Sequence, residues 1–285
     1  MSVNAARLEN LAGLRLLGMR TPDWQLPEGV PRGVWDYAQS RAIAEDYDDF
    51  HAENSLFEFE EQILREEFGE PKQGGVIADL GCGTGRALVP LARQGWRGLA
   101  VDLSERMLEV VREKAEIDSL EIDCVQANLV ALTPELVPDG SADHAMCLFS
   151  TLGMIRGRKN HRAALRNMHR ILKPRGKLVL HVHNFWFNLQ DPGGPWWVLR
   201  SLAKSWGLSR NDEFELGDKV FPYRGLPNFF LHVFRPRELR RDLASANLRV
   251  RRWIPLSVER RHALPRPWLF SSLRANGWIV VCERD

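Results

Sequence analysis

Short β-rich runs alternate with amphipathic segments between residues 75 and 184. Runs of β-branched and apolar residues predict strands, and apolar residues at helical spacing among charged ones predict helices. The expected strands are Val76–Leu80, Leu99–Leu103, Leu120–Val125, His144–Phe149 and Lys177–His183, and the expected helices are Arg86–Arg93, Glu105–Glu116 and Arg158–Leu172. Strands separated by helices indicate βαβ units, right-handed crossovers and a parallel sheet.

The pattern differs on both sides of this alternation. Residues 1–70 look helical, with a short amphipathic segment over residues 8–17 and one long helix from about Trp35 to Phe68. Residues 185–234 break the alternation with an aromatic-rich stretch and a hairpin expected near residues 219–234. The alternation then resumes with a helix from Pro236 and two strands near residues 248–256 and 278–282. We therefore expect a helical cap over 1–70 and a main domain over 71–285 that contains 185–234 as an insertion.

Composition narrows the class of protein. A net charge of +2 over 285 residues gives no overall field that would imply nucleic acid or a membrane. The four cysteines are scattered without a C-x-x-C pair, which indicates reduced thiols and a cytoplasmic location. No signal peptide is evident, and no apolar run approaches the roughly 20 residues that span a bilayer. No His, Cys or Asp cluster has metal-ligand spacing, so no metal is expected.

A glycine-rich turn after the first strand is the most informative motif. The run Val76–Arg86 reads V-I-A-D-L-G-C-G-T-G-R, so an apolar strand leads through glycines into a helix. A dinucleotide site would need a third glycine at position 86, where Arg86 would crowd the helix against the strand. Asp79 would repel a pyrophosphate but attract an ammonium group, by roughly 4 kcal/mol at ~4 Å before desolvation. The loop therefore favours a cofactor that contains an amino acid.

Two later strands end in polar residues that suit the rest of such a cofactor. Asp102 lies where an acidic residue would accept both ribose hydroxyls, although it could equally be a solvent-facing residue before a helix capped by Ser104. Met107 could cover an adenine face or belong to the ordinary core. Asn128 could recognise the adenine amino group or be a simple turn residue.

Together these features resemble the class I S-adenosylmethionine-dependent methyltransferases. The resemblance rests on residues 79–85, 101–104 and 143–149, and on the helix-to-strand turn at 172–178. It implies a Rossmann-like α/β fold with a seven-stranded, mostly parallel sheet, helices on both faces and an antiparallel last strand. It also implies S-adenosyl-L-methionine as cofactor and S-adenosyl-L-homocysteine as product. The cofactor contacts that it implies, together with the neighbouring motif positions, are Asp79, Gly81, Cys82, Gly83, Thr84, Gly85, Asp102, Leu103, Met107, Asn128, Leu129 and Phe149. Many family members carry Asp at the position of Asn128.

Catalytic candidates should lie beyond the carboxyl ends of the strands, because ligands bind there in open α/β sheets. His183 and Asn184, which follow the fifth strand, meet this condition, and His183 is the histidine expected to act as a base. Tyr47, with Tyr37 and His51, lies in the helical cap that often folds over the cofactor in this family. A general base is needed only if the acceptor must lose a proton.

The acceptor is less well defined than the cofactor. Trp186, Trp196, Trp197 and Trp206 could wall a small-molecule pocket under a substrate lid, form a satellite core, or contact a membrane surface. Basic clusters at residues 156–177 and 235–252 give the alternative of an RNA (tRNA or rRNA) methyltransferase. A small-molecule acceptor is the leading interpretation, and a non-catalytic cofactor-binding protein is a third. The oligomeric state is open.

Overall fold

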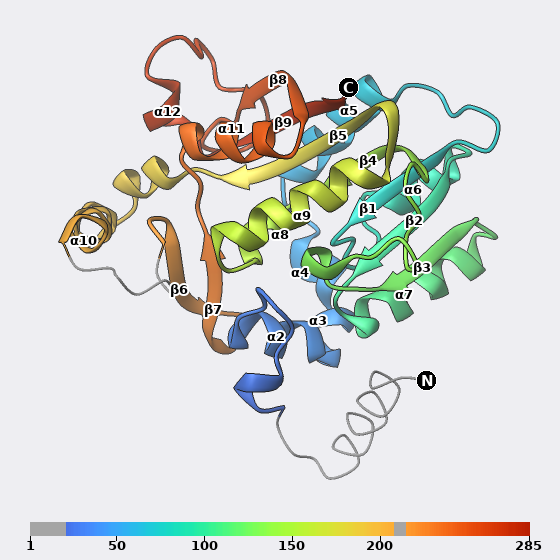
Figure 1. The fold of residues 1–285 in the computed structure, drawn as a ribbon, viewed down its shortest axis with the longest axis horizontal. Helices are drawn as coiled ribbons and strands as arrows, with labels where there is room; N and C mark the ends of the chain where they lie inside the picture. The colour runs from blue at the N-terminus through green and yellow to red at the C-terminus, as the bar shows by residue number, and fades with distance from the viewer. Residues whose placement is uncertain (1–20, 208–214) are drawn as a thin grey trace.

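The computed structural model describes residues 21–207 and 215–285. A three-layer α/β domain holds a central sheet between helices, with a small hairpin and a group of short helices beside it (Figure 1). The helices are η1 (Asp23–Gln25), α2 (Arg32–Gln39), α3 (Arg41–Glu45), α4 (Tyr47–His51), α5 (Leu56–Phe68), α6 (Leu88–Arg93), α7 (Glu105–Ile117), η2 (Leu129–Ala131), α8 (Thr151–Met154), α9 (Arg158–Ile171), η3 (Phe185–Gln190), α10 (Gly194–Gly207), α11 (Pro236–Ser245) and α12 (Ser271–Arg274). The strands are β1 (Val76–Leu80), β2 (Arg97–Asp102), β3 (Ile122–Gln126), β4 (Ala142–Cys147), β5 (Leu172–His183), β6 (Asp218–Tyr223), β7 (Leu226–His232), β8 (Leu248–Pro255) and β9 (Gly277–Arg284).

The central sheet confirms the predicted fold class. Its seven strands have the order β3-β2-β1-β4-β5-β9-β8. The first five strands in this order run parallel, and the last strand in the chain, β9, pairs antiparallel with both β5 and β8. Because β1 and β4 are neighbours although the chain moves outward from β1 to β3 first, the strand order reverses between them. Ligands of such sheets bind at this switch point, beyond the carboxyl ends of the strands.

Two apolar cores lie on opposite faces of the sheet, because successive strand residues point to opposite sides. On one face, α5, α6 and α7 pack against strand residues such as Ile77, Ala100 and Val179. On the other face, α9 and α11 pack against strand residues such as Ala78 and Leu180. The polar residues at the strand ends are therefore held by a scaffold that is buried on both faces.

The single long helix expected over residues 35–68 is wrong, because the cap folds as four shorter helices. Ser40 has an extended backbone and its hydroxyl accepts a hydrogen bond from Ile43 N, so α2 ends and α3 begins there. Asp46 separates α3 from α4, and the side chain of Asn54 accepts from Leu56 N at the start of α5. These breaks let the cap wrap around the carboxyl ends of β1 and β2. The amphipathic segment expected over residues 8–17 lies outside the described residues.

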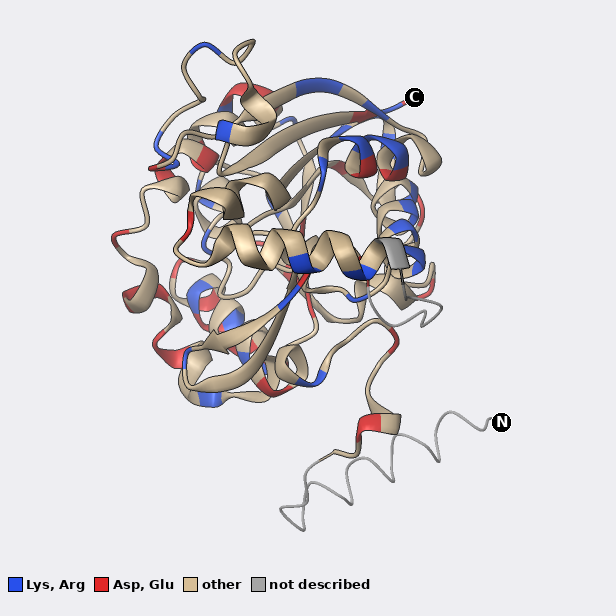
Figure 2. Cartoon of the chain, turned by 90° about the vertical axis from the view of Figure 1, so that its left-hand side faces the viewer, with Lys and Arg blue, Asp and Glu red and all other residues tan. Residues whose placement is uncertain are grey.

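The insertion after β5 has two parts with different neighbours. Trp197 packs with Phe185, Val198 and Val233 in a satellite core, and Trp186 lies against it. Trp196 on α10 is 71% exposed, and the side chain of Trp206 lies outside the described part of the chain. Seen from the side that carries α10, basic and acidic positions are interspersed over the chain (Figure 2). The hairpin β6–β7 instead packs against α2 of the cap.

All four cysteines are free thiols, and three of them are buried. Within residues 21–207 and 215–285, no helix has the length and apolar character needed to cross a membrane.

Candidate active site

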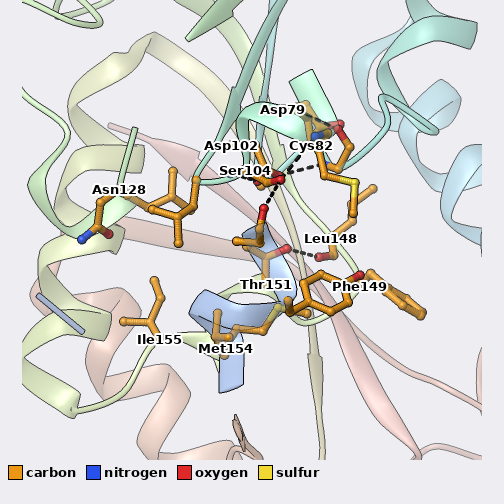
Figure 3. Close-up of a pocket in the computed structure, with 18 of the residues that line it drawn as sticks. Asp79, Cys82, Asp102, Ser104, Asn128, Leu148, Phe149, Thr151, Met154 and Ile155 are labelled. Carbon is orange, nitrogen blue, oxygen red and sulfur yellow. Dashed lines mark hydrogen bonds between the residues drawn. The ribbon is translucent and has the colours of Figure 1, made fainter. Parts of the chain in front are cut away.

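A deep pocket lies at the carboxyl ends of β1, β2 and β4, under the helical cap. It is lined by most of the residues predicted to bind the cofactor, and Asp79, Cys82 and Asp102 lie close together in it (Figure 3). The predicted residues that line it are Tyr47, Asp79, Gly81, Cys82, Gly83, Asp102, Leu103, Met107, Asn128, Leu129 and Phe149.

The glycine loop follows β1 and needs glycine for steric reasons. Gly81, Gly83 and Gly85 have φ values of +86°, +53° and +75°, a region that side chains with a Cβ rarely adopt. A Cβ on Gly81 would lie 2.2 Å from Cγ2 of Thr151, so the loop after β4 approaches the glycine backbone directly. The loop is thus held close to the end of β4, where a ligand would bridge the two strands.

The carboxylate of Asp102 joins the ends of β1 and β2. Its Oδ2 accepts from Gly83 N at 2.9 Å, and its Oδ1 accepts from Ser104 N at 2.8 Å. Burial raises the pKa of Asp102, and these backbone hydrogen bonds oppose the rise. Each oxygen keeps a lone pair, so the side chain can still accept hydrogen bonds from the hydroxyl groups of a ribose in the pocket.

Asp79 is a buried carboxylate of the pocket with a raised pKa. It is 3% exposed, and burial raises its pKa to about 7, while Arg86 lowers the value and Asp102 and Glu60 raise it further. An ammonium group beside this carboxylate would favour its ionised form. This is an environment that fits the amino group of a methionine moiety.

Arg86 lies at the same end of the pocket as Asp79. Its guanidinium forms an ion pair with the buried Glu60 at 2.6 Å and lies 3.6 Å from the centre of the Phe57 ring. The side chain therefore turns away from the strand that the sequence suggested it would crowd, and it lines the pocket beside Cys82. Burial raises the pKa of the Cys82 thiol, so this residue lines the pocket as a neutral group.

The predicted adenine end of the pocket holds Leu103, Met107, Asn128 and Leu129. The side chain of Asn128 caps η2, since its Oδ1 accepts from Val130 N at 3.0 Å. Its Nδ2 donates to the carbonyl of Glu28 at 2.8 Å, which ties the chain before α2 to the end of β3. Recognition of adenine by Asn128 stays a prediction. The side chain would contact adenine while it keeps its hydrogen bonds to Val130 and Glu28.

Thr84 and Gly85 belong to the motif but lie behind the pocket. The hydroxyl of Thr84 is buried and donates to Oδ1 of Asp48 at 2.6 Å, and Lys114 also contacts Asp48. A Cβ on Gly85 would lie 3.2 Å from Val89 and Val111. Thr84 therefore fixes the cap to the loop, and Gly85 permits the close packing of α6 on α7.

The structure separates the three predicted catalytic residues. Tyr47 lines the pocket, and burial raises the pKa of its phenol, so it is a hydrogen-bond donor and not a base. The side chain of Asn184 caps η3 and also donates to the carbonyls of Ser272 and Ala275, at 2.7 and 2.8 Å. These contacts make Asn184 a structural residue that fastens the end of β5.

His183 does not line the pocket either. Burial lowers its pKa to about 3, and His181 and Arg260 lower it further. Its ring contacts His181, with 5.3 Å between the two ring centres. The structure therefore lends no support to His183 as the base.

A different histidine, His51, lies behind the pocket wall and contacts the lining residues Tyr47 and Phe149. Its ring is 4.7 Å from that of Tyr47 and 5.1 Å from that of Phe149, centre to centre, and its Nε2 is 3.3 Å from the Tyr223 hydroxyl. Burial lowers its pKa to about 4, and Arg224 and Arg86 add to the effect. Sequence patterns placed His51 only among weaker candidates and missed Tyr223, because nothing local shows that the β6–β7 hairpin folds onto the cap.

Comparisons with known proteins agree with this geometry. Residues 77–176 match the family model of a methyltransferase domain. A Geobacillus protein named as a methyltransferase is 33% identical over 38% of this chain and 42% of its own length. The demethylmenaquinone methyltransferase of Thermus thermophilus is 27% identical over 72% of this chain and 74% of its own. The chain spans less than half the length of several other relatives, such as mouse glycine N-methyltransferase.

A solved structure shows the same fold over almost the whole chain. The 1,6-didemethyltoxoflavin-N1-methyltransferase of Burkholderia thailandensis, bound to S-adenosylhomocysteine, superposes with a TM-score of 0.57 at 16% identity, over 93% of this chain and 98% of that one. Asp79, Asp102 and the glycine loop lie where a nucleoside that carries an amino acid can bind, so the pocket fits S-adenosylmethionine. Domain match, fold and pocket agree: residues 77–176 match a methyltransferase domain, and the chain has the fold of an S-adenosylmethionine-dependent methyltransferase.

Proposed function

We propose that the chain transfers a methyl group from S-adenosylmethionine to a small, largely apolar acceptor. The observation that carries this proposal is a single pocket with two unlike sides. Asp79, Asp102 and the glycine loop form a polar side, and apolar side chains from α2 and α8 complete the same space. The polar groups of a nucleoside cofactor would use the first side, which leaves the apolar side chains to face an acceptor.

On the polar side, the chain's own residues would hold the cofactor at three points. Asp79 would accept from the ammonium group, Asp102 would accept from the ribose hydroxyls, and Arg86 lies close enough to Asp79 to pair with the carboxylate of the same methionine moiety. Tyr47 lies over the loop, with its ring 3.9 Å from the position of a Cβ on Gly83. The cofactor would supply an electrophilic methyl group that is ready for direct in-line transfer.

The other side of the pocket has the character of a site for an apolar molecule. Val34 and Tyr37 of α2 line this side. Met154 and Ile155, from the end of α8, lie across the pocket from Asp79 and Asp102 (Figure 3). The ring of Tyr37 also packs against Phe229 of the hairpin, with ring centres 5.4 Å apart. Such a wall excludes water and orients the acceptor, which can supply several kcal/mol towards transfer. Demethylmenaquinone and 1,6-didemethyltoxoflavin, the acceptors in the names of two matched proteins, support a small-molecule acceptor.

Proton removal, where the acceptor requires it, would fall to His51. The low pKa of His51 keeps its imidazole neutral at pH 7, in the form that can accept a proton, but also makes it a weak base, so it would suit an acceptor whose proton is already acidic. Tyr223 contacts its Nε2 and would orient the ring or relay the proton. Phe149 lines the pocket and packs on His51, which places the histidine one side chain away from the cofactor.

The RNA alternative has less support in the structure. In the 156–177 cluster, Arg158 and Arg162 both pair with the buried Asp242, and Lys177 pairs with Glu67. In the 235–252 cluster, Arg251 pairs with Glu283 and Arg252 with Glu67. These cations already have intramolecular partners, so fewer are left to neutralise phosphates than the sequence suggested.

A label-transfer screen tests the proposal directly. Purified protein would be incubated with methyl-labelled S-adenosylmethionine and a cell extract separated into small molecules, RNA and protein. We expect label in the small-molecule fraction, and expect its loss with the Asp79→Ala variant. Label in RNA would support the alternative acceptor, and a wild-type protein that neither binds the cofactor nor transfers label would refute the proposal.

A further inference from the structure

A second group of functional side chains lies outside the pocket, under the hairpin. His161 of α9, Glu215 just before β6 and His232 at the end of β7 bring one potential ligand atom each to within 4.8 Å of one another. Both histidines are fully buried, and Glu215 is partly buried. We call this group the His161–Glu215–His232 cluster.

His161 has a ring nitrogen with no partner in the described part of the chain. Its Nε2 lies 2.7 Å from the carbonyl oxygen of Ile155, so Nε2 carries the proton and donates to that carbonyl. Its Nδ1 is then left with a free lone pair, and this buried atom has no hydrogen-bond partner there. A buried polar atom without a partner costs about 1–3 kcal/mol, so such an atom in a cluster of ligand-type groups points to a missing ligand.

Further contacts orient the other members of the cluster. His232 Nδ1 lies 2.7 Å from Asp218 Oδ1, and its Nε2 lies at a longer 3.2 Å from Glu238 Oε1. The backbone N–H of Arg158 donates to Glu215 Oε1 at 2.6 Å, which leaves the second carboxylate oxygen available. Histidines that bind metals are oriented by a carboxylate or a carbonyl on the other ring nitrogen, and both His161 and His232 have such a partner.

We propose that the His161–Glu215–His232 cluster binds a divalent transition-metal ion, for which Zn²⁺ is the best match. Two imidazole nitrogens and a carboxylate oxygen form a ligand set that Zn²⁺ accepts readily. The metal would bond to Nε2 of His232, the nitrogen with the longer contact to Glu238, and the proton on Nε2 would leave to solvent. Asp218 would keep its contact with Nδ1. No electron transfer accompanies this exchange.

The site would fasten the insertion to the main domain. His161 lies on α9, whereas Glu215 and His232 lie at the two ends of the segment that contains the hairpin. The same hairpin packs on α2, and Ile155, whose carbonyl accepts from His161, lines the pocket. An ion in this position would therefore hold one wall of the pocket and the base of the hairpin together.

Calorimetric titration of the chelator-treated 285-residue chain with ZnCl₂ tests the site. We expect saturable binding at one ion per chain, and a rise in Tm when the ion is present. The His161→Phe variant keeps a ring in contact with Phe234 but removes the ligand nitrogen, and we expect its Zn²⁺ affinity to fall at least about 100-fold. The Asp218→Asn variant should weaken binding by about 10- to 100-fold.

A matched control and a second measurement keep the test decisive. The His169→Phe variant changes another histidine of α9, outside the cluster, and should bind Zn²⁺ as the wild type does. Co²⁺ should give visible absorption bands in the wild type that His161→Phe lacks. A folded wild type that takes up no ion, or a His161→Phe variant that binds as tightly as the control, would overturn the proposal and identify the cluster as a hydrogen-bonded network.

Discussion

The polar side of the pocket comes from one stretch of chain, residues 79–102, whereas the apolar side is assembled from distant segments. On the polar side, backbone hydrogen bonds connect Asp102 to the glycine loop, and both lie at the ends of adjacent strands. On the apolar side, α2, α8 and the hairpin meet through packing, in which Gly33 of α2 and Gly153 of α8 lie directly against the backbone of β7. Because the wall is assembled by packing beside a fixed cofactor site, substitutions in the wall can change the acceptor while the cofactor stays the same.

Removing the Asp79 carboxylate should have the largest effect on the polar side. In the Asp79→Ala variant the ammonium group loses its buried partner, and we expect the Kd for S-adenosylmethionine to rise about 100-fold. Calorimetry measures this directly, and Glu113→Ala, on the exposed surface of α7, is the matched control. Equal affinities for both variants would show that the polar side does not hold the amino acid moiety.

The pH dependence of cofactor binding offers a sharper test of the same carboxylate. The pKa of Asp79 is about 7 in the free site, so the group is increasingly protonated below pH 7 and cannot pair with an ammonium. Affinity should therefore fall about tenfold between pH 8 and pH 6. The Asp79→Asn variant has no proton to lose and should show a flat profile. A wild-type profile as flat as that of the variant would contradict the assignment.

Local motifs made the polar side predictable, and the lack of such motifs explains what was missed. The strand–loop–helix run at residues 76–86 specifies its own geometry, so Asp79, Gly81 and Asp102 could be predicted to line one pocket. The breaks at Ser40 and Asp46 were missed because amphipathic periodicity continues across them.

Catalytic and metal candidates depend on tertiary contacts that no local pattern contains. Asn184 follows a strand as a catalytic residue would, yet its partners Ser272 and Ala275 come from the far end of the chain. His161 and His232 show no ligand spacing in the sequence, and only the packing of the hairpin on α9 brings them together. Position after a strand is therefore a weaker guide to function than a continuous motif.

A change on the apolar side should affect the acceptor and leave the cofactor alone. The Met154→Ala variant removes part of the wall, and we expect the KM for the acceptor to rise about fivefold while the Kd for S-adenosylmethionine changes less than about twofold. Steady-state kinetics with the acceptor found by label transfer, together with calorimetry, separates the two effects. Leu136→Ala, on an exposed turn, serves as the control. If Met154→Ala weakens cofactor and acceptor to the same extent, the two sides are not independent.

The smallest expected effect concerns the contact between the glycine loop and the helical cap. Thr84 belongs to the glycine loop, but its buried hydroxyl donates to Asp48 of the cap and not into the pocket. In Thr84→Val the loss of this hydrogen bond should lower the free energy of unfolding by about 1 kcal/mol, measured in urea, with the Kd for S-adenosylmethionine raised no more than about twofold. The Asp48→Asn variant and the double variant complete a cycle, and the double variant should cost less than the sum of the two. A loss of cofactor affinity as large as that of Asp79→Ala would instead place Thr84 in contact with the cofactor, as the motif alone suggested.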